Sequence, residues 1–437
     1  MALIVQKYGG SSVADTASLK RVAQRVVAAH RAGHDVVVVV SAMGDTTDDL
    51  LDMAAELNPD APKREMDMLL SAGERISMSL LAMAITAEGV PAYAYTGRQA
   101  GIHTDTRYGK ASITGMVPER VARALHTGSV AIVAGFQGVN DRGDVTTLGR
   151  GGSDTTAVAL AAALNADVCE IFTDVDGLFT ADPRIVPLAR QVRKLDYQET
   201  LELAANGAKI LHLRAVEYAR RYRVPLHVRS SFSDKLGTWI ADDRPASTLA
   251  GYLDPDSFDR KEQDMEQPII SGIAHDRSQE KITVAGLPDK PGTAAELFRQ
   301  VAAADANIDM IVQNIAVNVP GRSTITFTCQ SGDAKDILER LEKAREILDY
   351  REIVYNPEIG KLSLVGAGMR TNPGISARFF EALSKAGVNV EMISTSEVRI
   401  SVIVDADRLD EAVRALHAEF NLDAQETEAV VYGGTGR

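Results

Sequence analysis

The stretch Thr147-Leu148-Gly149-Arg150-Gly151-Gly152-Ser153-Asp154 organises the rest of this chain, because it joins a strand pattern to a helix pattern through glycines. An apolar run, residues 130–136, precedes it, and an alanine-rich helical pattern, residues 157–164, follows it. Glycines let backbone N–H groups approach a ligand closely, and Ser, Asp and Thr are good N-caps. Such a succession predicts an anion-binding site, although a plain strand-to-helix turn is the alternative for the glycines alone. The guanidinium of Arg150 adds a cation that can hold a carboxylate or a phosphate.

Three other apolar runs end in polar loops of the same kind. Residues 3–6 lead into Lys7 and a glycine pair, residues 36–40 lead into the loop 41–48, and residues 168–173 lead into the aspartate-rich loop 174–184. Continuous apolar runs are typical of parallel strands buried on both faces, and ligands of open α/β sheets bind at the carboxyl ends of the strands. We therefore predict that these loops gather at one edge of a mainly parallel sheet. Taken alone, Lys7 would be interpreted as a solvated lysine before a turn.

The composition is that of an ordinary soluble globular protein, with 45% hydrophobic and 24% charged residues in a chain of 437. The net charge of −13 argues against a broad basic face for nucleic acid or an anionic membrane. Cys169 and Cys329 stand in apolar runs without metal-ligand spacing, which favours buried thiols in a reducing compartment. No signal peptide and no membrane-spanning apolar run is recognisable, so we expect a cytoplasmic protein.

An internal repeat follows a polar, proline-containing segment, residues 242–268. Pro291-Gly292 is echoed by Pro373-Gly374, at an offset of 82 residues, and Phe298 is echoed by Phe380. Each repeat has the pattern strand, Pro-Gly turn, helix, strand, which predicts two small units of βαββ type.

The candidate site is suited to phosphoryl transfer. The N-terminal 240 residues lack the common nucleotide-loop, protein-kinase and hydrolase signatures, but they offer glycine loops, cations and aspartates. Transfer of a phosphoryl group depends mostly on positioning and on neutralising charge. A carboxylate acceptor is already ionised at pH 7, so no general base is required.

Five motifs together resemble the aspartate kinase family, closest to its monofunctional actinobacterial type. They are Lys7-Tyr-Gly-Gly-Ser-Ser-Val, Ser71-Ala-Gly-Glu-Arg, Thr147-Leu-Gly-Arg-Gly-Gly-Ser-Asp, Thr173-Asp-Val-Asp-Gly and Asp182-Pro-Arg. The resemblance covers nearly the whole chain. It implies an α/β amino-acid-kinase fold, with a mainly parallel sheet sandwiched by helices, followed by two ferredoxin-like βαββαβ ACT units. The implied reaction is transfer of the ATP γ-phosphate to L-aspartate, giving 4-phospho-L-aspartate in lysine, threonine and methionine biosynthesis.

The domain boundaries that we expect follow from the same resemblance. Residues 1–245 form the catalytic domain, residues 246–266 a linker, residues 267–348 the first ACT unit and residues 349–437 the second. The strand within residues 267–280 is expected to complete the second unit.

The resemblance also implies the site residues. The catalytic group is Lys7, Gly9, Gly10, Arg150, Asp154 and Lys209. The residues expected to bind aspartate are Ser41, Asp45, Thr46, Thr47, Glu74, Arg150, Gly151, Gly152 and Ser153. The residues expected to bind ATP are Lys7, Tyr8, Gly9, Gly10, Thr173, Asp174, Phe179, Arg184 and Lys209. Mg2+ is expected to bridge the phosphates, and no side chain is assigned to it.

The ACT units imply feedback by lysine and threonine bound between units. The effector residues expected in the first unit are Asp289, Lys290, Pro291, Gly292, Thr293, Ala294, Asn307, Ile308, Asp309 and Gln313. Those expected in the second are Ile375, Ser376, Asn389, Val390, Ser396 and Glu397. The expected assembly is either an α2β2 oligomer, whose regulatory subunit starts internally near Met265, or a homodimer.

Two alternatives remain at this point. One is another enzyme of the amino-acid-kinase fold, such as a glutamate, N-acetylglutamate or uridylate kinase. The other is a non-catalytic amino-acid sensor with a dead kinase domain. A panel of substrates distinguishes the first alternative, and a hydroxamate assay with aspartate and ATP tests the second.

Overall fold

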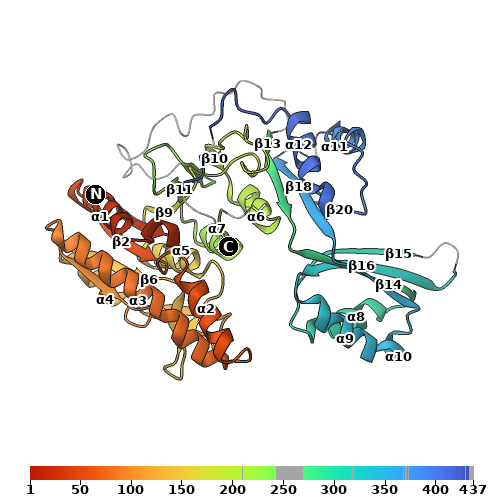
Figure 1. Ribbon diagram of the computed structural model, residues 1–437, viewed down its shortest axis with the longest axis horizontal. Coiled ribbons are helices and arrows are strands. Elements are labelled where there is room, and N and C mark those ends of the chain that lie inside the picture. The colour runs from red at the N-terminus through yellow and green to blue at the C-terminus, as the bar shows by residue number, and fades with distance from the viewer. Residues whose placement is uncertain are drawn as a thin grey trace.

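The computed structural model describes residues 1–208, 210–242, 269–315, 319–367, 369, 372, 374–428 and 430–432. All statements below concern these residues. Lys209, the expected linker 246–266 and Met265 lie outside them. Figure 1 shows a helix-covered sheet domain formed by the N-terminal half and two smaller sheet units formed by the C-terminal half.

The N-terminal half is built on an eight-stranded sheet with the order β10-β12-β11-β9-β1-β2-β6-β3. Its pairs are parallel except for β11 with β12. Its strands are β1 (Leu3–Tyr8), β2 (Asp35–Val40), β3 (Ala92–Tyr95), β6 (Val130–Ala134), β9 (Val168–Thr173), β10 (Lys194–Leu195), β11 (Leu226–Ser230) and β12 (Thr238–Ile240). The central strands are buried on both faces, as their continuous apolar runs predict.

Helices cover both faces of this sheet. One face packs against α1 (Thr16–Arg31) and α3 (Lys63–Ala87). The other packs against α4 (Glu119–His126), α5 (Gly152–Leu164) and α7 (Leu213–Tyr222). The remaining helices of this half are η1 (Gly10–Val13), α2 (Thr46–Leu57) and α6 (Tyr197–Ala205). A small sheet of order β5-β4-β7-β8 lies beside them, with strands β4 (Ile102–Thr104), β5 (Ile113–Met116), β7 (Gln137–Val139) and β8 (Val145–Thr147).

Helix α3 is the one described helix that is long and apolar enough to cross a membrane. It is part of the domain core, because Leu81 and Ile85 are fully buried against the sheet. Its buried side also carries two acidic residues, Asp67 and Glu74, which belong to the candidate functional site.

The C-terminal half forms two four-stranded antiparallel sheets. The first has the order β15-β16-β14-β17 and the second β13-β18-β20-β19. The strands are β13 (Ile269–Asp276), β14 (Gln279–Pro288), β15 (Ile308–Ile315), β16 (Arg322–Gln330), β17 (Glu352–Asn356), β18 (Ile359–Ala367), β19 (Met392–Thr395) and β20 (Arg399–Asp405). The first sheet is covered by α8 (Thr293–Ala302), α9 (Ala334–Lys343) and α10 (Arg345–Leu348), and the second by α11 (Gly374–Lys385) and α12 (Leu409–Glu419), which η4 (Ala406–Arg408) precedes.

Two strands show how the units share the chain. Strand β13 precedes the first unit in the sequence, yet it pairs with β18 of the second. Strand β17 pairs with β14 of the first unit. The expected boundary at residue 349 had placed β17 in the second unit, so the first unit extends one strand further.

Equivalent positions of the repeat meet between the two units. Lys281 of β14 pairs with Glu391, which precedes β19, and Lys361 of β18 pairs with Asp309 of β15. Met310 and Met392 pack together in one small apolar cluster. These reciprocal contacts give the tandem units an approximate two-fold relationship.

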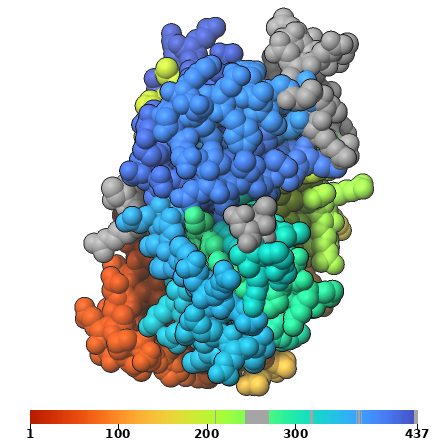
Figure 2. All heavy atoms as spheres, turned by 90° about the vertical axis from the view of Figure 1, so that its right-hand side faces the viewer, coloured from red at the N-terminus to blue at the C-terminus, as the bar shows by residue number. Residues whose placement is uncertain are grey.

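The second unit packs its core against the sheet domain. Its core cluster contains Phe179, Ala181, Val186 and Ala189 from the loop after β9. In Figure 1 the second unit lies beside α6, and the first unit lies below the second. Figure 2 shows the same order, with the second unit in blue above the first in cyan.

Candidate functional site

The site lies where the parallel strands end. Lys7 is near the end of β1, Ser41 directly follows β2, and Thr173 ends β9. Because these strands are neighbours in the order β9-β1-β2, their following loops share one edge of the sheet.

Lys7 and Asp154 form the centre of this edge. Lys7 Nζ lies 2.6 Å from Asp154 Oδ1, and the two side chains are only 13% and 11% exposed. Asp154 stands in the first turn of α5, where the positive helix end favours its charge. The pair holds the ammonium group beside the backbone of Gly9, which also donates a hydrogen bond to the carbonyl of Phe172.

The turn before α5 requires glycine at position 151. Gly151 has φ of 68°, and a Cβ there would lie 2.1 Å from the ring of His212. Both His212 and Arg214 stand at the start of α7, and the Arg214 guanidinium donates to the Leu148 carbonyl at 2.8 Å. His212 and Arg214 therefore support the turn that carries Arg150, which is itself exposed. The sequence analysis missed both, since a single His and a single Arg at a helix start have no distinctive spacing.

A second loop, residues 41–46, packs against α3 at Gly73 and Glu74. A Cβ on Gly73 would lie 2.6 Å from Cβ of Ala42, so no larger residue fits. Glu74 is 3% exposed, and its Oε1 accepts the Ala42 N–H at 3.2 Å. Its Oε2 has no hydrogen-bond partner among the described residues. Burial raises the pKa of Glu74 to about 7.

Other residues expected to bind aspartate adjoin these two loops. Asp45 is the exposed N-cap of α2, and Thr46 and Thr47 begin that helix. Ser153, 8% exposed, lies in the first turn of α5 directly before Asp154.

Asp67 of α3 is a buried residue of this region that the sequence analysis did not identify. It is 1% exposed, and its carboxylate accepts the N–H groups of Gly109 and Thr147 and the Thr147 hydroxyl at 2.7–3.0 Å. Asp67 thus ties β8 and the loop around Gly109 to α3, just ahead of the glycine turn.

The loop after β9 contains the residues expected to bind the nucleotide. The Thr173 hydroxyl donates to Asp174 Oδ1 at 2.9 Å, and both residues are partly exposed. Arg184 is exposed and pairs with Asp182 at 2.7 Å. The hydrogen bonds from Arg184 hold the pKa of Asp182 below its usual value, despite the opposing effect of burial.

Two residues expected at the nucleotide are buried instead. The ring of Tyr8 is fully buried and stacks on Phe172, with centroids 4.6 Å apart, and burial raises its pKa well above the usual range. Phe179 is 6% exposed and packs in the core of the second C-terminal unit. Their apolar rings are satisfied by these cores, so their side chains do not face the strand-end site.

The expected effector residues have mixed surroundings. Asp289 and Lys290 are exposed in the turn before α8, Pro291 and Gly292 continue that turn, and Thr293 and Ala294 begin the helix. Asn307 and Gln313 are exposed at and within β15, next to the partly buried Ile308. Ser376, Asn389 and Glu397 are exposed in the second unit, and Val390 is partly buried.

Among the expected effector residues, Ile375, Asp309 and Ser396 have partners within the chain. Ile375 is 2% exposed in the core of the second unit. Asp309 pairs with the buried Lys361, and Ser396 donates to Glu202 of α6 at 3.0 Å. These contacts give the three residues structural roles, which local sequence could not reveal.

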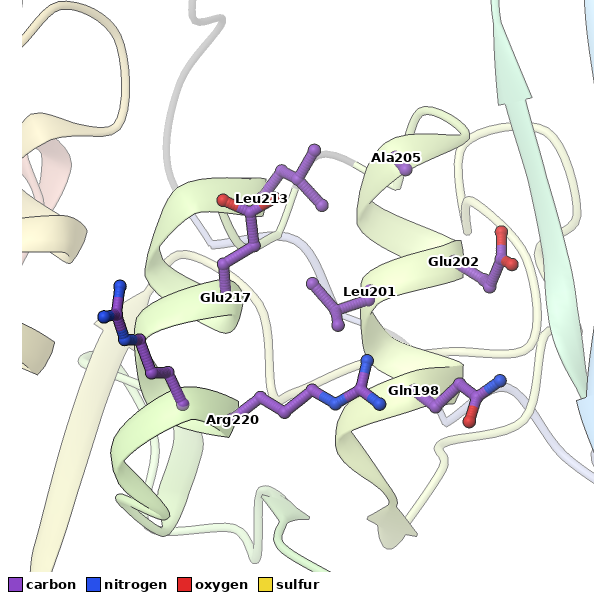
Figure 3. Close-up of a pocket in the computed structure, with 8 residues that line it drawn as sticks. Gln198, Leu201, Glu202, Ala205, Leu213, Glu217 and Arg220 are labelled. Carbon is purple, nitrogen blue, oxygen red and sulfur yellow. The ribbon is translucent and has the colours of Figure 1, made fainter.

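A groove of about 650 Å³ lies apart from this edge, between α6 and α7. Figure 3 shows Leu201 pointing between the two helices and Arg220 reaching across from α7. The lining residues are Gln198, Leu201, Glu202, Ala205, Leu213, Glu217, Arg220 and Arg221. None of the expected aspartate or nucleotide residues belongs to it.

Within the described ranges no group of three or more His, Cys, Asp or Glu side chains could cage a metal ion. Mg2+ commonly binds through one or two carboxylates, substrate phosphates and water, and the partly exposed carboxylate of Asp174 fits that requirement. The edge as a whole offers an ammonium, glycine amides and a guanidinium, a set suited to anions.

Comparison with protein-family models matches residues 2–230 to the amino acid kinase family. Residues 281–346 and 362–420 each match an ACT domain. The catalytic and regulatory parts of the chain thus match separate families, in the order that the fold shows.

Curated relatives match over the full length. Aspartokinase of Mycolicibacterium smegmatis is 56% identical over 441 residues, covering 100% of both chains. Aspartokinase of Corynebacterium glutamicum is 54% identical with the same coverage. Aspartokinase of Pseudomonas aeruginosa is 46% identical over 97% of this chain and 98% of its own.

Solved structures are also similar. The aspartate kinase of Synechocystis has a TM-score of 0.52 at 41% identity, covering 97% of this chain and 70% of that one. E. coli aspartokinase III in complex with aspartate and ADP has a TM-score of 0.79 at 24% identity, covering 96% of this chain and 100% of that one. The second likeness supports the fold.

Proposed function

This chain belongs to the aspartokinase family, and we propose that it transfers the γ-phosphate of ATP to the β-carboxylate of L-aspartate. The observation that carries the proposal is the largely buried Lys7–Asp154 pair beside a glycine turn at the strand edge. Phosphoryl transfer needs such a fixed cation among backbone donors more than it needs a base.

The reaction proceeds without proton transfer in this proposal. A β-carboxylate oxygen of aspartate forms a bond to the γ-phosphorus, and the bond from that phosphorus to the bridging oxygen of ADP breaks. Lys7 and the amides of Gly9 and Gly10 stabilise the negative charge on the moving group. Asp154 keeps the Lys7 ammonium in place.

Aspartate is held through its α-groups. The Arg150 guanidinium forms a bidentate contact with the α-carboxylate, and the free Oε2 of Glu74 accepts hydrogen bonds from the ammonium. Ser41, Asp45, Thr46, Thr47 and the amides of residues 151–153 complete the pocket.

The nucleotide lies over the end of β9. Thr173 and Asp174 contact it, Arg184 approaches its outer side, and Lys209 interacts with its phosphates. When bound, Mg2+ would neutralise phosphate charge, and the partly exposed carboxylate of Asp174 would hold it. An ATP-dependent step of this kind belongs in the cytoplasm.

We propose feedback by lysine and threonine at the C-terminal units, within the biosynthesis of lysine, threonine and methionine. E. coli aspartokinase III has been crystallised in complex with lysine and aspartate, in a structure that has a TM-score of 0.68 at 25% identity. The exposed turn at Asp289 and Lys290 is the part of this chain that we assign to the effector.

We also propose an oligomer. The edge strand β15 exposes Ile311 and Ile315 by 53% and 68%, an apolar edge suited to another unit. A regulatory subunit starting near Met265 would contain β13 and therefore every strand of both C-terminal sheets.

A substrate panel tests the proposed activity. Product formation with ATP is compared for aspartate, glutamate, N-acetylglutamate and UMP, with hydroxylamine trapping the acyl phosphates. Turnover with aspartate and with no other acceptor of the panel supports the proposal. Preference for another acceptor points to another kinase of this fold. No turnover with any acceptor favours an amino-acid sensor.

A further inference from the structure

The segment that follows α12 returns to the catalytic domain. Residues 423–432 form two antiparallel bridges with the loop after β9, Ala189 with Asp423 and Val175 with Val431. In Figure 1 the dark blue chain beyond α12 runs back toward β10 and β11. The segment therefore borders the loop whose first residue is Asp174.

The contacts of this segment concentrate on both ends of that loop. The Tyr432 N–H donates to the Asp174 carbonyl at 2.8 Å. At the other end, the Gln191 N–H donates to Glu428 Oε2 at 2.8 Å. The Tyr432 ring stacks on Phe232, with centroids 6.0 Å apart and planes at 12°.

The start of the segment is anchored in the core. His417, fully buried in α12, contacts the Thr180 hydroxyl through Nε2 at 2.8 Å and Asp423 through Nδ1 at 3.1 Å. The Leu422 carbonyl accepts from the same hydroxyl at 3.2 Å. The segment thus leaves the second C-terminal unit at a fixed point and ends beside Asp174.

The loop has little regular structure of its own, so contacts from the segment add to those that hold it in place. Between β9 and β10 the described chain forms turns and isolated bridges, held in part by its own backbone hydrogen bonds, such as Thr180 N–H to the Arg190 carbonyl. The Asp174 carbonyl and the Gln191 N–H are paired with residues of the segment. The bond from Tyr432 lies directly beside Thr173, at the Asp174 carbonyl. A loop that is held in its binding geometry loses less entropy when a ligand binds.

We propose that Glu428, Val431 and Tyr432 position the nucleotide-binding loop, so that Tyr432 acts as a positioning residue for ATP. The inference rests on the proposed function, in which Thr173 and Asp174 contact the nucleotide. Tyr432 acts through the Asp174 backbone and the Phe232 ring, with no direct role in the chemical step.

Two pairs of variants test this in the full enzyme. A chain ending after Ala424 loses Glu428, Val431 and Tyr432, while a chain ending after Tyr432 keeps every described contact of the segment. Tyr432→Ala removes the stacked ring, while Tyr432→Phe keeps it. Each variant is assayed for ADP affinity by calorimetry and for the KM values of ATP and aspartate.

We expect the shorter truncation and Tyr432→Ala to weaken ADP binding and raise the ATP KM about tenfold, with the aspartate KM changed less than about twofold. The two controls should match the wild type. Unchanged ADP affinity in Tyr432→Ala, or equal increases of both KM values, overturns the inference. ADP binding needs no acceptor, so wild-type protein that binds ADP without phosphorylating aspartate refutes the proposed function while leaving this test intact.

Discussion

Lys7 Nζ of β1 and Asp154 Oδ1 of α5 lie 2.6 Å apart, joining the central strand of the sheet to the helix that follows the glycine turn. Replacing Asp154 with Asn removes the charge that fixes the ammonium while keeping the shape of the side chain. We expect kcat to fall about 100-fold to 1,000-fold in Asp154→Asn and in Lys7→Ala, as when other preorganised charge stabilisers are lost.

The matched control for this pair is Lys20→Ala, which removes an exposed lysine of α1. Its steady-state kcat should equal that of the wild type. A kcat for Asp154→Asn within about threefold of the wild type would argue against the assigned role.

Arg150 is exposed in the turn before α5 and should act on aspartate binding. Arg150→Ala removes a bidentate partner of the α-carboxylate, so we expect the aspartate KM to rise about 10-fold to 100-fold with the ATP KM nearly unchanged. Arg142→Ala, at another exposed arginine between β7 and β8, serves as control. An unaffected aspartate KM in Arg150→Ala would remove Arg150 from the substrate site.

Glu74 links aspartate affinity to pH. Its pKa of about 7 in the folded protein means that the carboxylate is charged above pH 7 and neutral below it. Because only the charged form pairs with the substrate ammonium, the aspartate KM should fall as the pH rises from 6 to 8. In Glu74→Gln the KM should be high and should lose this pH dependence.

The raised pKa of Glu74 also predicts that the protein becomes less stable as the pH rises, although aspartate binding improves. Between pH 4.5 and 7 the folded state keeps a proton that the unfolded state has lost, so stability contributed by the neutral form is lost as the pH rises. Above pH 7 the ionised carboxylate lowers the free energy of unfolding by roughly 3 kcal/mol. Urea unfolding at pH 8 should therefore show Glu74→Gln to be more stable than the wild type, with little difference at pH 5.

Asp67 should matter for stability more than for catalysis. Asp67→Asn replaces one acceptor oxygen with an NH2 group that faces buried N–H donors of Gly109 and Thr147. We expect unfolding to become easier by about 2–3 kcal/mol, measured by urea titration of the ligand-free protein. Asp105→Asn, at a more exposed aspartate of the same region, should have a smaller effect.

Asp289 tests the assigned effector turn. Its side chain is exposed and its N–H donates to Gly321, so Asp289→Ala should leave folding and uninhibited turnover near normal. We expect inhibition by threonine with lysine to be relieved, measured as the effector concentration at half inhibition. Asp336→Ala, at an exposed aspartate of α9 in the same unit, should stay as sensitive as the wild type. Equal sensitivity of the two variants would place the effector elsewhere.

Much of the strand edge could be predicted because buried parallel strands leave continuous apolar runs, such as residues 36–40, followed directly by polar loops. The burial of Tyr8 and Phe179 could not, since an aromatic ring beside a polar motif suits a ligand or a core equally well. Strand β17 and the bridge from Val431 to Val175 pair residues far apart in the chain, and local patterns do not specify such pairings. His212 was missed for a related reason: its importance comes from its contact with Gly151.

Because β13 precedes the first C-terminal unit in the chain but belongs to the sheet of the second, neither unit can be cut out of the chain without the other. A protease cut ahead of Ile269 would leave both sheets intact and joined by one chain. A cut at Arg277 or Ser278 would instead separate β13 from the chain that follows it. Loss of β13 would leave β18 as an unpaired edge strand, which is prone to aggregation. Such interlocking means that the two units can be transplanted or deleted together but not singly.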